Sequence, residues 1–205
     1  SLNEFGDELS KNSVAPGGGS VSALVGNLGS ALISMVAALT FEKKGFENSR
    51  KKMELAGTKA QLIKEKLANL IDDDTNAFNN VIEASRLPDA NNNEKKAKEL
   101  ALLKANKNAI NIPLEVSRLS YDILGLSYDL INDINPNSIS DLAVASEVSF
   151  ASLRGATLNI YINMNEVESD KEFVDNVLKE VDVMLNKATE LKDKIFKESI
   201  QIINS

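Results

Sequence analysis

The sequence predicts an all-α protein with a single domain over residues 1–205, built as a bundle of long antiparallel helices. Three observations predict this fold. Apolar residues recur at alternating steps of three and four along most of the chain, which is the period of an amphipathic helix. The strict alternation of a half-buried strand is almost absent. Turn residues gather at a few places between the periodic stretches, and 205 residues permit one sizeable core.

A short helix is expected around Leu2, Phe5 and Leu9, followed by a charge-free helix over residues 20–39. No charged residue occurs between residues 12 and 41. This stretch is long enough to span a membrane, but it contains four serines and an asparagine and has no basic cluster on one flank. We therefore expect a buried helix and no membrane association.

Small residues recur every four positions within this charge-free helix. Ser22, Gly26 and Ser30 form one such series, and Gly19 and Ala23 form another. Small residues at this spacing let neighbouring backbones approach closely. The close approach is expected either inside the bundle or across a subunit interface.

The next helix is expected over residues 46–85. Its core-facing positions repeat at steps of three and four and are apolar except for one carboxylate, Asp74. These positions are Met53, Ala56, Ala60, Ile63, Leu67, Leu70, Asp74, Ala77 and Val81. The sequence LPDANNN, residues 87–93, predicts the turn that ends this helix and begins the next.

A further helix is expected from residue 94 to about residue 131. Pro113 lies within it and is expected to kink or break the helix. The core-facing positions are expected to be Leu100, Leu103, Lys107, Ile110, Leu114, Ser117, Tyr121, Leu124 and Tyr128.

Two more helices complete the bundle. Residues 135–137 predict a turn, after which Ser138 or Ser140 can cap a helix to about residue 167. The last helix is expected to follow Asp170. Its apolar face carries Val174, Val177, Val181, Met184, Ala188, Leu191, Ile195 and Ile202.

Composition excludes several classes of function. The 23 basic and 30 acidic residues give a formal charge of −7, which argues against a dedicated nucleic-acid binder but not against an anionic small molecule. The chain has no Cys and no His, so thiolate or imidazole metal sites and Ser-His nucleophilic pairs are impossible. Proton transfer would have to come from Asp, Glu, Lys, Tyr or water. No secretory signal begins the sequence, so a cytoplasmic location is expected.

Asp74 is the main candidate for chemistry. Burial disfavours the ionised form of a carboxyl, so its pKa is expected to be raised unless a cation or several donors meet it. Such a group can act as a general acid or base near neutral pH. The alternative is a structural ion pair with Lys107. Lys107 is the charged residue among the apolar core-facing positions of the next helix, just as Asp74 is in its own helix. The adjacent Asp72 and Asp73 are expected to be solvated.

Two further groups of residues are candidates for ligand binding. Gly17, Gly18 and Gly19 precede Ser20 at a predicted helix start, where they form either a flexible entry or a backbone site for an anion or oxyanion. Asn159 and Asn163 lie four apart on one helix face. They either orient a heteroaromatic ring or satisfy each other across an interface.

Charged residues elsewhere have two possible roles. Asp141 is either an acid favoured at the start of a helix by the helix dipole or a residue of the site. Lys43, Lys44 and Arg50, with Lys51 and Lys52 beside them, form the one dense basic patch. This patch is either a solvated surface cluster or a clamp for an anionic substrate tail.

Several segments resemble one known family. APGGGSVSALVGNLGSALISMVAALT followed by EKKGF resembles the opening of the cyclodeaminase domain of formiminotransferase-cyclodeaminase, whose bacterial relatives include stand-alone methenyltetrahydrofolate cyclohydrolases. The likeness continues in DDDTNAF, NIPLEV, NPNSISDLAVA and GATLNIYINM. It therefore spans almost the whole chain. Glu42 and Gly45 depart from the pattern expected for the basic segment.

The resemblance implies an all-helical homodimer that acts on a tetrahydrofolate derivative without a metal or redox cofactor. It also implies that this substrate carries a polyglutamate chain, which would be the anionic tail. Two reactions are implied: closure of 5-formiminotetrahydrofolate to the 5,10-methenyl form with loss of ammonia, or interconversion of the methenyl and 10-formyl forms.

The site roles that follow from the resemblance place Asp74 as principal acid/base, with Asp141 assisting it or bonding the pterin. Asn159 and Asn163 would position the folate, and Lys43, Lys44 and Arg50 would hold its glutamyl carboxylates. The segment from Gly17 to Ser20 would line the cleft. The rival hypothesis is a helical interaction module without catalysis, in which the small-residue helix is only a dimer interface.

Overall fold

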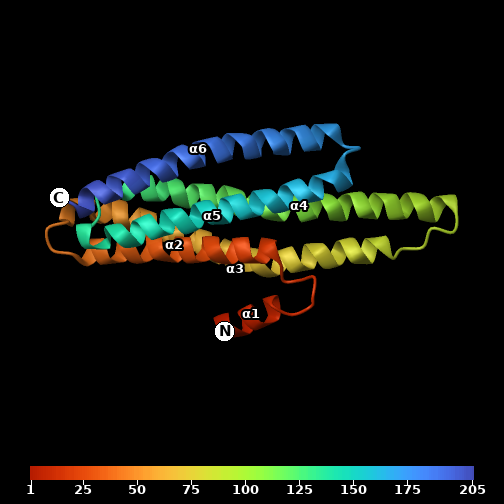
Figure 1. Ribbon diagram of the computed structural model, residues 1–205, viewed down its shortest axis with the longest axis horizontal. Coiled ribbons are helices and arrows are strands. Elements are labelled where there is room, and N and C mark those ends of the chain that lie inside the picture. The colour runs from red at the N-terminus through yellow and green to blue at the C-terminus, as the bar shows by residue number, and fades with distance from the viewer.

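The computed structural model describes residues 1–205, and it is all-helical, as the sequence predicts. Five long helices lie side by side along the long axis of the molecule, and the short first helix lies apart from them (Figure 1). The α-helices are α1 (Leu2–Leu9), α2 (Gly18–Glu42), α3 (Arg50–Ser85), α4 (Asn92–Leu130), α5 (Ile139–Met164) and α6 (Lys171–Ile203). Short 3₁₀ turns are η1 (Glu47–Ser49), η2 (Pro136–Ser138) and η3 (Asn165–Val167).

The apolar faces of the long helices meet in one bundle. α2 packs against α3, α4 and α5, while α6 covers α4 and α5. The seam predicted for α3 is confirmed, because its apolar members from Met53 to Ala77 are buried. α1 buries none of its residues, which agrees with its position beside the bundle (Figure 1).

Close packing of α2 against α5 explains the small residues of both helices. A Cβ atom on Gly29 would lie 2.4 Å from Oγ of Ser149, and one on Gly26 would lie 2.7 Å from Oγ of Ser152. Ser152 also donates a hydrogen bond of 2.6 Å to the backbone oxygen of Ser22. The four-residue spacing therefore serves packing inside the chain.

α2 is also the one helix that is long and apolar enough to cross a membrane, with a mean hydropathy of 1.8. Core helices of soluble proteins share this length and composition, so the property alone is weak support for a membrane span. In the structure, one side of α2 is buried against three neighbouring helices.

The helix starts differ in how they are capped. Asn91 accepts hydrogen bonds from the backbone N–H groups of Asn93 and Glu94, and Asp170 accepts one from Phe173 at 3.2 Å. Ser138 occupies the cap position of α5, but its side chain makes no capping bond, so that part of the prediction is wrong. The preceding 3₁₀ turn already brings the chain into the helix, and Asn135 caps that turn instead.

α4 bears on two predictions. Of the two outcomes expected at Pro113, the break does not occur, since the helix runs unbroken from Asn92 to Leu130, and the kink stays a prediction. Leu100 is 69% exposed rather than core-facing, because the first turns of α4 extend beyond α5 and α6 (Figure 1). Further along, α4 contacts α3, α5 and α6, so more than one of its faces is buried.

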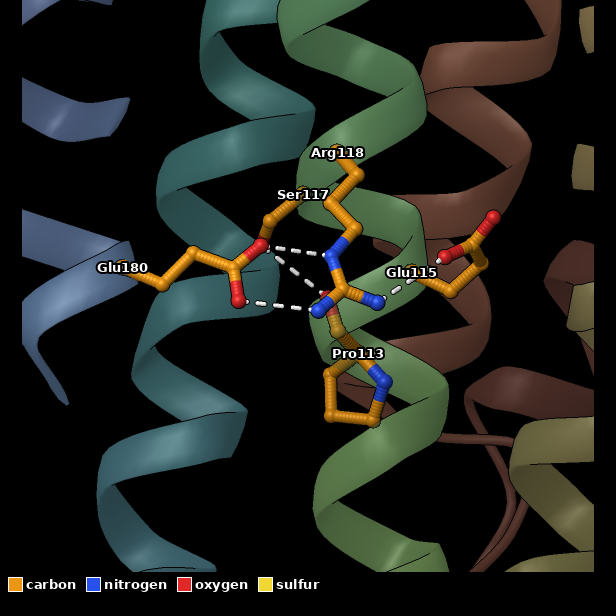
Figure 2. Close-up of polar contacts among 5 residues, drawn as sticks. All are labelled: Pro113, Glu115, Ser117, Arg118 and Glu180. Atoms are coloured by element: carbon orange, nitrogen blue, oxygen red, sulfur yellow. Dashed lines mark hydrogen bonds and ion pairs between the residues drawn. The ribbon is translucent and has the colours of Figure 1, made fainter. Parts of the chain in front are cut away.

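A bidentate ion pair fastens α6 to α4 close to Pro113. Figure 2 shows the guanidinium of Arg118 between the carboxylates of Glu180 on α6 and Glu115 on α4. Arg118 donates to the two oxygens of Glu180 at 2.6 and 2.8 Å. These bonds raise the pKa of Arg118 and lower the pKa of Glu180. Because the pair is partly exposed, it contributes no more than about 1 kcal/mol.

Candidate active site

A cavity of about 460 Å³ lies where the segment before α2 meets α3, α4 and α5. Its size is that of a small-molecule site. It is lined by Val14, Ala15, Gly17, Gly18, Gly19, Asp74, Ala77, Phe78, Val81, Ser85, Leu102, Asn106, Ala109, Asn159, Asn163 and Glu166. The structure thus brings together the three predicted glycines, the predicted carboxylate and both predicted asparagines.

Asp74 enters this cavity from the core-facing side of α3. Burial raises its pKa above the ordinary value of 3.8, although bonds from the hydroxyl and backbone of Ser20 oppose that rise. The Ser20 hydroxyl lies 2.9 Å from Oδ2 of Asp74. Asp72 and Asp73 are exposed, as predicted. Asp74 therefore has the environment of a carboxyl that can carry a proton closer to neutral pH.

The alternative role of Asp74 as an ion-pair partner of Lys107 is wrong. Lys107 instead bonds Asp170 at the start of α6. Its ammonium also lies 5.0 Å from the ring centre of Phe173. The carboxyl of Asp74 consequently has a hydroxyl neighbour but no paired cation.

The glycine segment fits tightly around Asp74. Gly17 is the N-cap of α2 and supplies no side-chain capping bond. A Cβ atom on Gly19 would lie 2.0 Å from Oδ1 of Asp74. Any other residue at position 19 would therefore displace the carboxyl of Asp74. The partial positive charge of the helix start faces a carboxylate of the same chain, and it favours the ionised form against the effect of burial.

Asn159 and Asn163 both bond to backbone oxygens rather than to each other. Nδ2 of Asn159 donates to the oxygen of Gly155 at 2.8 Å, one turn back on α5. Nδ2 of Asn163 donates to the oxygen of Ala109 on α4 at 2.9 Å. With each nitrogen bound in this way, each amide oxygen is available to accept a hydrogen bond from a ligand in the cavity.

The other predicted site residues lie far from this cavity within one chain. Asp141 precedes Asn159 by 18 residues on α5, a separation of about 27 Å along the helix. Lys43 follows Gly18 by 25 residues, or about 37 Å along α2. Arg50 begins α3 beside this end of α2, where it donates to the backbone oxygen of Phe41 at 3.2 Å. A single chain does not place these residues at the cavity.

The sequence prediction missed several cavity residues, of which Asn106 and Phe78 are the most informative. Asn106 is only 7% exposed, whereas its neighbour Lys107 was expected to face the core. The predicted face of α4 is nevertheless buried on both sides of Lys107, since Ile110 is 0% exposed and Leu103 packs against the core, so Asn106 belongs to a second buried face that the prediction did not include. A signal was present, since Leu102, Asn106 and Ala109 are also spaced by four and three.

The arrangement is suited to acid/base chemistry on a bound organic ligand. A carboxyl with a raised pKa and two amide oxygens line the same partly apolar cavity. The chain contains no group of three or more Asp or Glu side chains placed to hold a metal ion.

Comparison with known proteins agrees with this description. Residues 1–183 match the family described as formiminotransferase-cyclodeaminase. The chain is 33% identical to methenyltetrahydrofolate cyclohydrolase of Methylorubrum extorquens, over 95% of this chain and 93% of that protein. It is 32% identical to mouse formimidoyltransferase-cyclodeaminase over 83% of this chain, but it spans only 31% of that longer protein.

A solved structure extends the likeness to three dimensions. The crystal structure of formiminotetrahydrofolate cyclodeaminase from Thermotoga maritima superposes with a TM-score of 0.88 at 30% sequence identity. The match covers 99% of this chain and 97% of the other. The chain therefore belongs to the formiminotransferase-cyclodeaminase family, a family of folate enzymes whose members include both cyclodeaminases and a cyclohydrolase.

Proposed function

We propose that this protein is a formiminotetrahydrofolate cyclodeaminase that converts 5-formiminotetrahydrofolate to 5,10-methenyltetrahydrofolate and ammonia. The observation that carries the proposal is the half-buried carboxyl of Asp74, which lies in a cavity shared with the glycine segment and two asparagines. The whole-length similarity to the cyclodeaminase of Thermotoga maritima supports it.

The proposed reaction needs one proton to move between two nitrogens. N10 of the folate attacks the carbon of the protonated formimino group, forming the C–N10 bond. The carboxylate of Asp74 takes the proton from N10 and delivers it to the former imino nitrogen. The C–N bond then breaks, ammonia leaves, and the positive charge stays on the methenyl bridge. A carboxyl whose pKa lies above its ordinary value can both accept and return this proton.

The cavity walls would orient the substrate for this step. The amide oxygens of Asn159 and Asn163 would accept hydrogen bonds from N–H groups of the pterin, because their own nitrogens are bound to the backbone. Phe78 would cover a face of the ring. Fixing the ring in this way would bring N10 within reach of the formimino carbon.

A second candidate is the cyclohydrolase reaction. The cyclohydrolase of Methylorubrum extorquens matches this chain over 93% of its own length, which favours this alternative. Water would then attack the methenyl carbon, and Asp74 would take one proton from that water and deliver it to N5. As the C–N5 bond breaks and the formyl C=O forms, the remaining hydroxyl proton would pass to solvent. The two reactions use the same carboxyl and differ in whether ammonia or water is exchanged.

The experiment that tests the proposal gives the purified protein each folate separately. Methenyl absorbance and ammonia release are followed together. A cyclodeaminase forms both from 5-formiminotetrahydrofolate, whereas a cyclohydrolase interconverts the methenyl and 10-formyl forms only. Asp74→Asn is expected to lower turnover by at least about 100-fold. Undiminished activity of that variant would contradict the role of Asp74, and absence of saturable folate binding would favour the interaction module.

We also propose that the active form is a homodimer held by the exposed apolar sides of α2 and α5. Leu28, Met35 and Leu39 recur at steps of seven and four on α2 and are each more than a third exposed. Val144, Leu158 and Ile162 form a similar stripe on α5 and are at least half exposed. A second copy with the same stripes would remove both from water.

A two-fold axis near the middle of α2 would place two α2 helices antiparallel. The end of one helix that carries Lys43 and Lys44 would then lie beside the glycine segment of the other. In that arrangement the basic patch of one chain would meet the glutamyl carboxylates of a folate bound in its partner. Asp141 lies in the first turn of α5, which begins at the end of the bundle where α2 ends (Figure 1), so it would approach that site as well.

A further inference from the structure

Pro113 occupies a position where a helix ordinarily loses a hydrogen bond. It lies inside the 39-residue helix α4 and is buried (Figure 2). In an α-helix the backbone N–H of residue 113 would bond the oxygen of residue 109. Proline has no N–H, and its ring also crowds the carbonyl four residues earlier. The backbone oxygen of Ala109 is therefore left without its helical donor.

The missing donor is supplied from another helix. Nδ2 of Asn163 on α5 lies 2.9 Å from the oxygen of Ala109. Both residues line the cavity that contains Asp74. The bond thus joins α4 to α5 at the wall of the site.

This bond also decides which way the amide of Asn163 faces. A backbone oxygen can only accept, so the amide atom that meets Ala109 has to be the nitrogen. The amide oxygen then faces away from that contact and is free for a ligand. If Ala109 already had its helical donor, the bond from Asn163 would be less favourable. The amide of Asn163 could then rotate and present its nitrogen to the cavity instead.

We propose that Pro113 is a positioning residue: by withholding a helical donor from Ala109, it holds the Asn163 amide in the orientation that presents a hydrogen-bond acceptor to the substrate. The identity of that substrate as a reduced folate rests on the proposed function. The orientation of the Asn163 amide in the ligand-free protein does not depend on the proposed function.

The test compares Pro113→Ala with the wild-type protein, first without ligand. The side-chain amide protons of Asn163, observed by NMR and assigned with Asn163→Ala, are expected to be protected from exchange in the wild type. They lose that protection in Pro113→Ala, while the urea midpoint of unfolding stays equal or rises because the helix regains a bond. Full protection of the Asn163 amide in Pro113→Ala would overturn the proposal.

The second part measures binding of tetrahydrofolate and steady-state kinetics. Pro113→Ala is expected to raise Kd and KM by about three- to tenfold, the effect of one neutral hydrogen bond, with little change in kcat. When Asn163→Ala is already present, adding Pro113→Ala is expected to cause no further change in Kd. When the matched Asn159→Ala is present instead, adding Pro113→Ala still raises Kd. An equal rise of Kd in both backgrounds would overturn the role of Pro113 as well.

Asn163→Asp provides an independent variant that keeps the size of the side chain. A carboxylate cannot donate to Ala109, so two acceptors face each other, and the urea midpoint falls. Pro113→Ala in the same chain returns a donor to Ala109 and is expected to recover part of that loss. No recovery would contradict the proposal. If the wild type bound no tetrahydrofolate, the proposed function would fail while the NMR and urea results still decided the role of Pro113.

Discussion

The carboxyl of Asp74 is stabilised in its protonated form by burial, and this has a consequence for stability. Its pKa is raised above 3.8, so the native state binds more protons than the unfolded state between the unfolded and folded pKa values. The stabilisation is fully present below the unfolded pKa and is lost as pH rises through the folded pKa. At neutral pH the ionised carboxyl therefore destabilises the fold.

Asp74→Asn is expected to raise the urea midpoint at neutral pH, because a neutral amide takes the place of a buried charge and still accepts from Ser20. The difference from the wild type should shrink as pH falls through the raised pKa and vanish near pH 3. Urea unfolding over a pH series measures it. A midpoint difference that does not depend on pH would show that Asp74 titrates normally.

Gly19 offers a second test at the same place. In Gly19→Ala the new methyl group would lie 2.0 Å from Oδ1 of Asp74, and the carboxyl is the group that can move. Turnover is expected to fall at least about tenfold, while the free energy of unfolding changes by no more than about 1 kcal/mol because alanine suits a helix.

Gly18→Ala is the matched control for this variant. Its methyl group would approach Asn159 at 3.6 Å, an ordinary contact that displaces no atom of Asp74, so turnover should fall much less than in Gly19→Ala. Equal losses in the two variants would mean that flexibility of the glycine segment, rather than the position of Asp74, controls the rate.

At the scale of helices, the contact between α2 and α5 depends on missing side chains. In Gly29→Ala the added methyl group would lie 2.4 Å from Oγ of Ser149 and 3.2 Å from the backbone oxygen of Ala145. Because the backbone cannot easily move, the substitution is expected to lower the free energy of unfolding by about 1–3 kcal/mol.

Gly125→Ala on α4 provides the comparison, since nothing lies within 4 Å of its added methyl group. It should raise the free energy of unfolding by about 0.5–1 kcal/mol through helix propensity alone. Urea denaturation measures both variants. Stabilisation by Gly29→Ala would show that the two helices can separate without cost.

The period of apolar residues predicted where the helices lie, and it also identified Asp74 as the one carboxylate in the seam of α3. The partner of Lys107 could not be predicted, because pairing between helices depends on their relative register and not on spacing within one helix. Asp170 meets Lys107 from a loop 63 residues away. Leu100 was mistaken for core because a seam does not show where neighbouring helices end.

At the scale of the whole molecule, motifs that are close in sequence need not be close in space. The glycine segment and the basic patch lie at opposite ends of the same helix, about 37 Å apart. The cavity residues come from four separate segments, and their meeting follows from the antiparallel order of the bundle. The sequence alone therefore predicted residues that one chain brings together, whereas the anion clamp stays a prediction that requires a second chain.

The proposed dimer can be tested by mixing two variants that are impaired for different reasons. Asp74→Asn lacks the acid/base, and the double variant Lys43→Ala/Lys44→Ala lacks two cations of the clamp and is expected to be slow below saturating polyglutamylated folate. If each site takes Asp74 from one chain and its cations from the other, one of the two sites in a mixed dimer contains both. Unfolding and refolding an equal mixture puts half of the chains into mixed dimers.

The refolded mixture should therefore regain about a quarter of wild-type activity, whereas each variant refolded alone stays far below that level under the same conditions. Leu28→Lys, placed in the apolar stripe of α2, should abolish this recovery and halve the mass measured by light scattering. A mixture as inactive as its components, in protein that light scattering shows to be dimeric, would mean that the basic patch of one chain does not serve the cavity of the other.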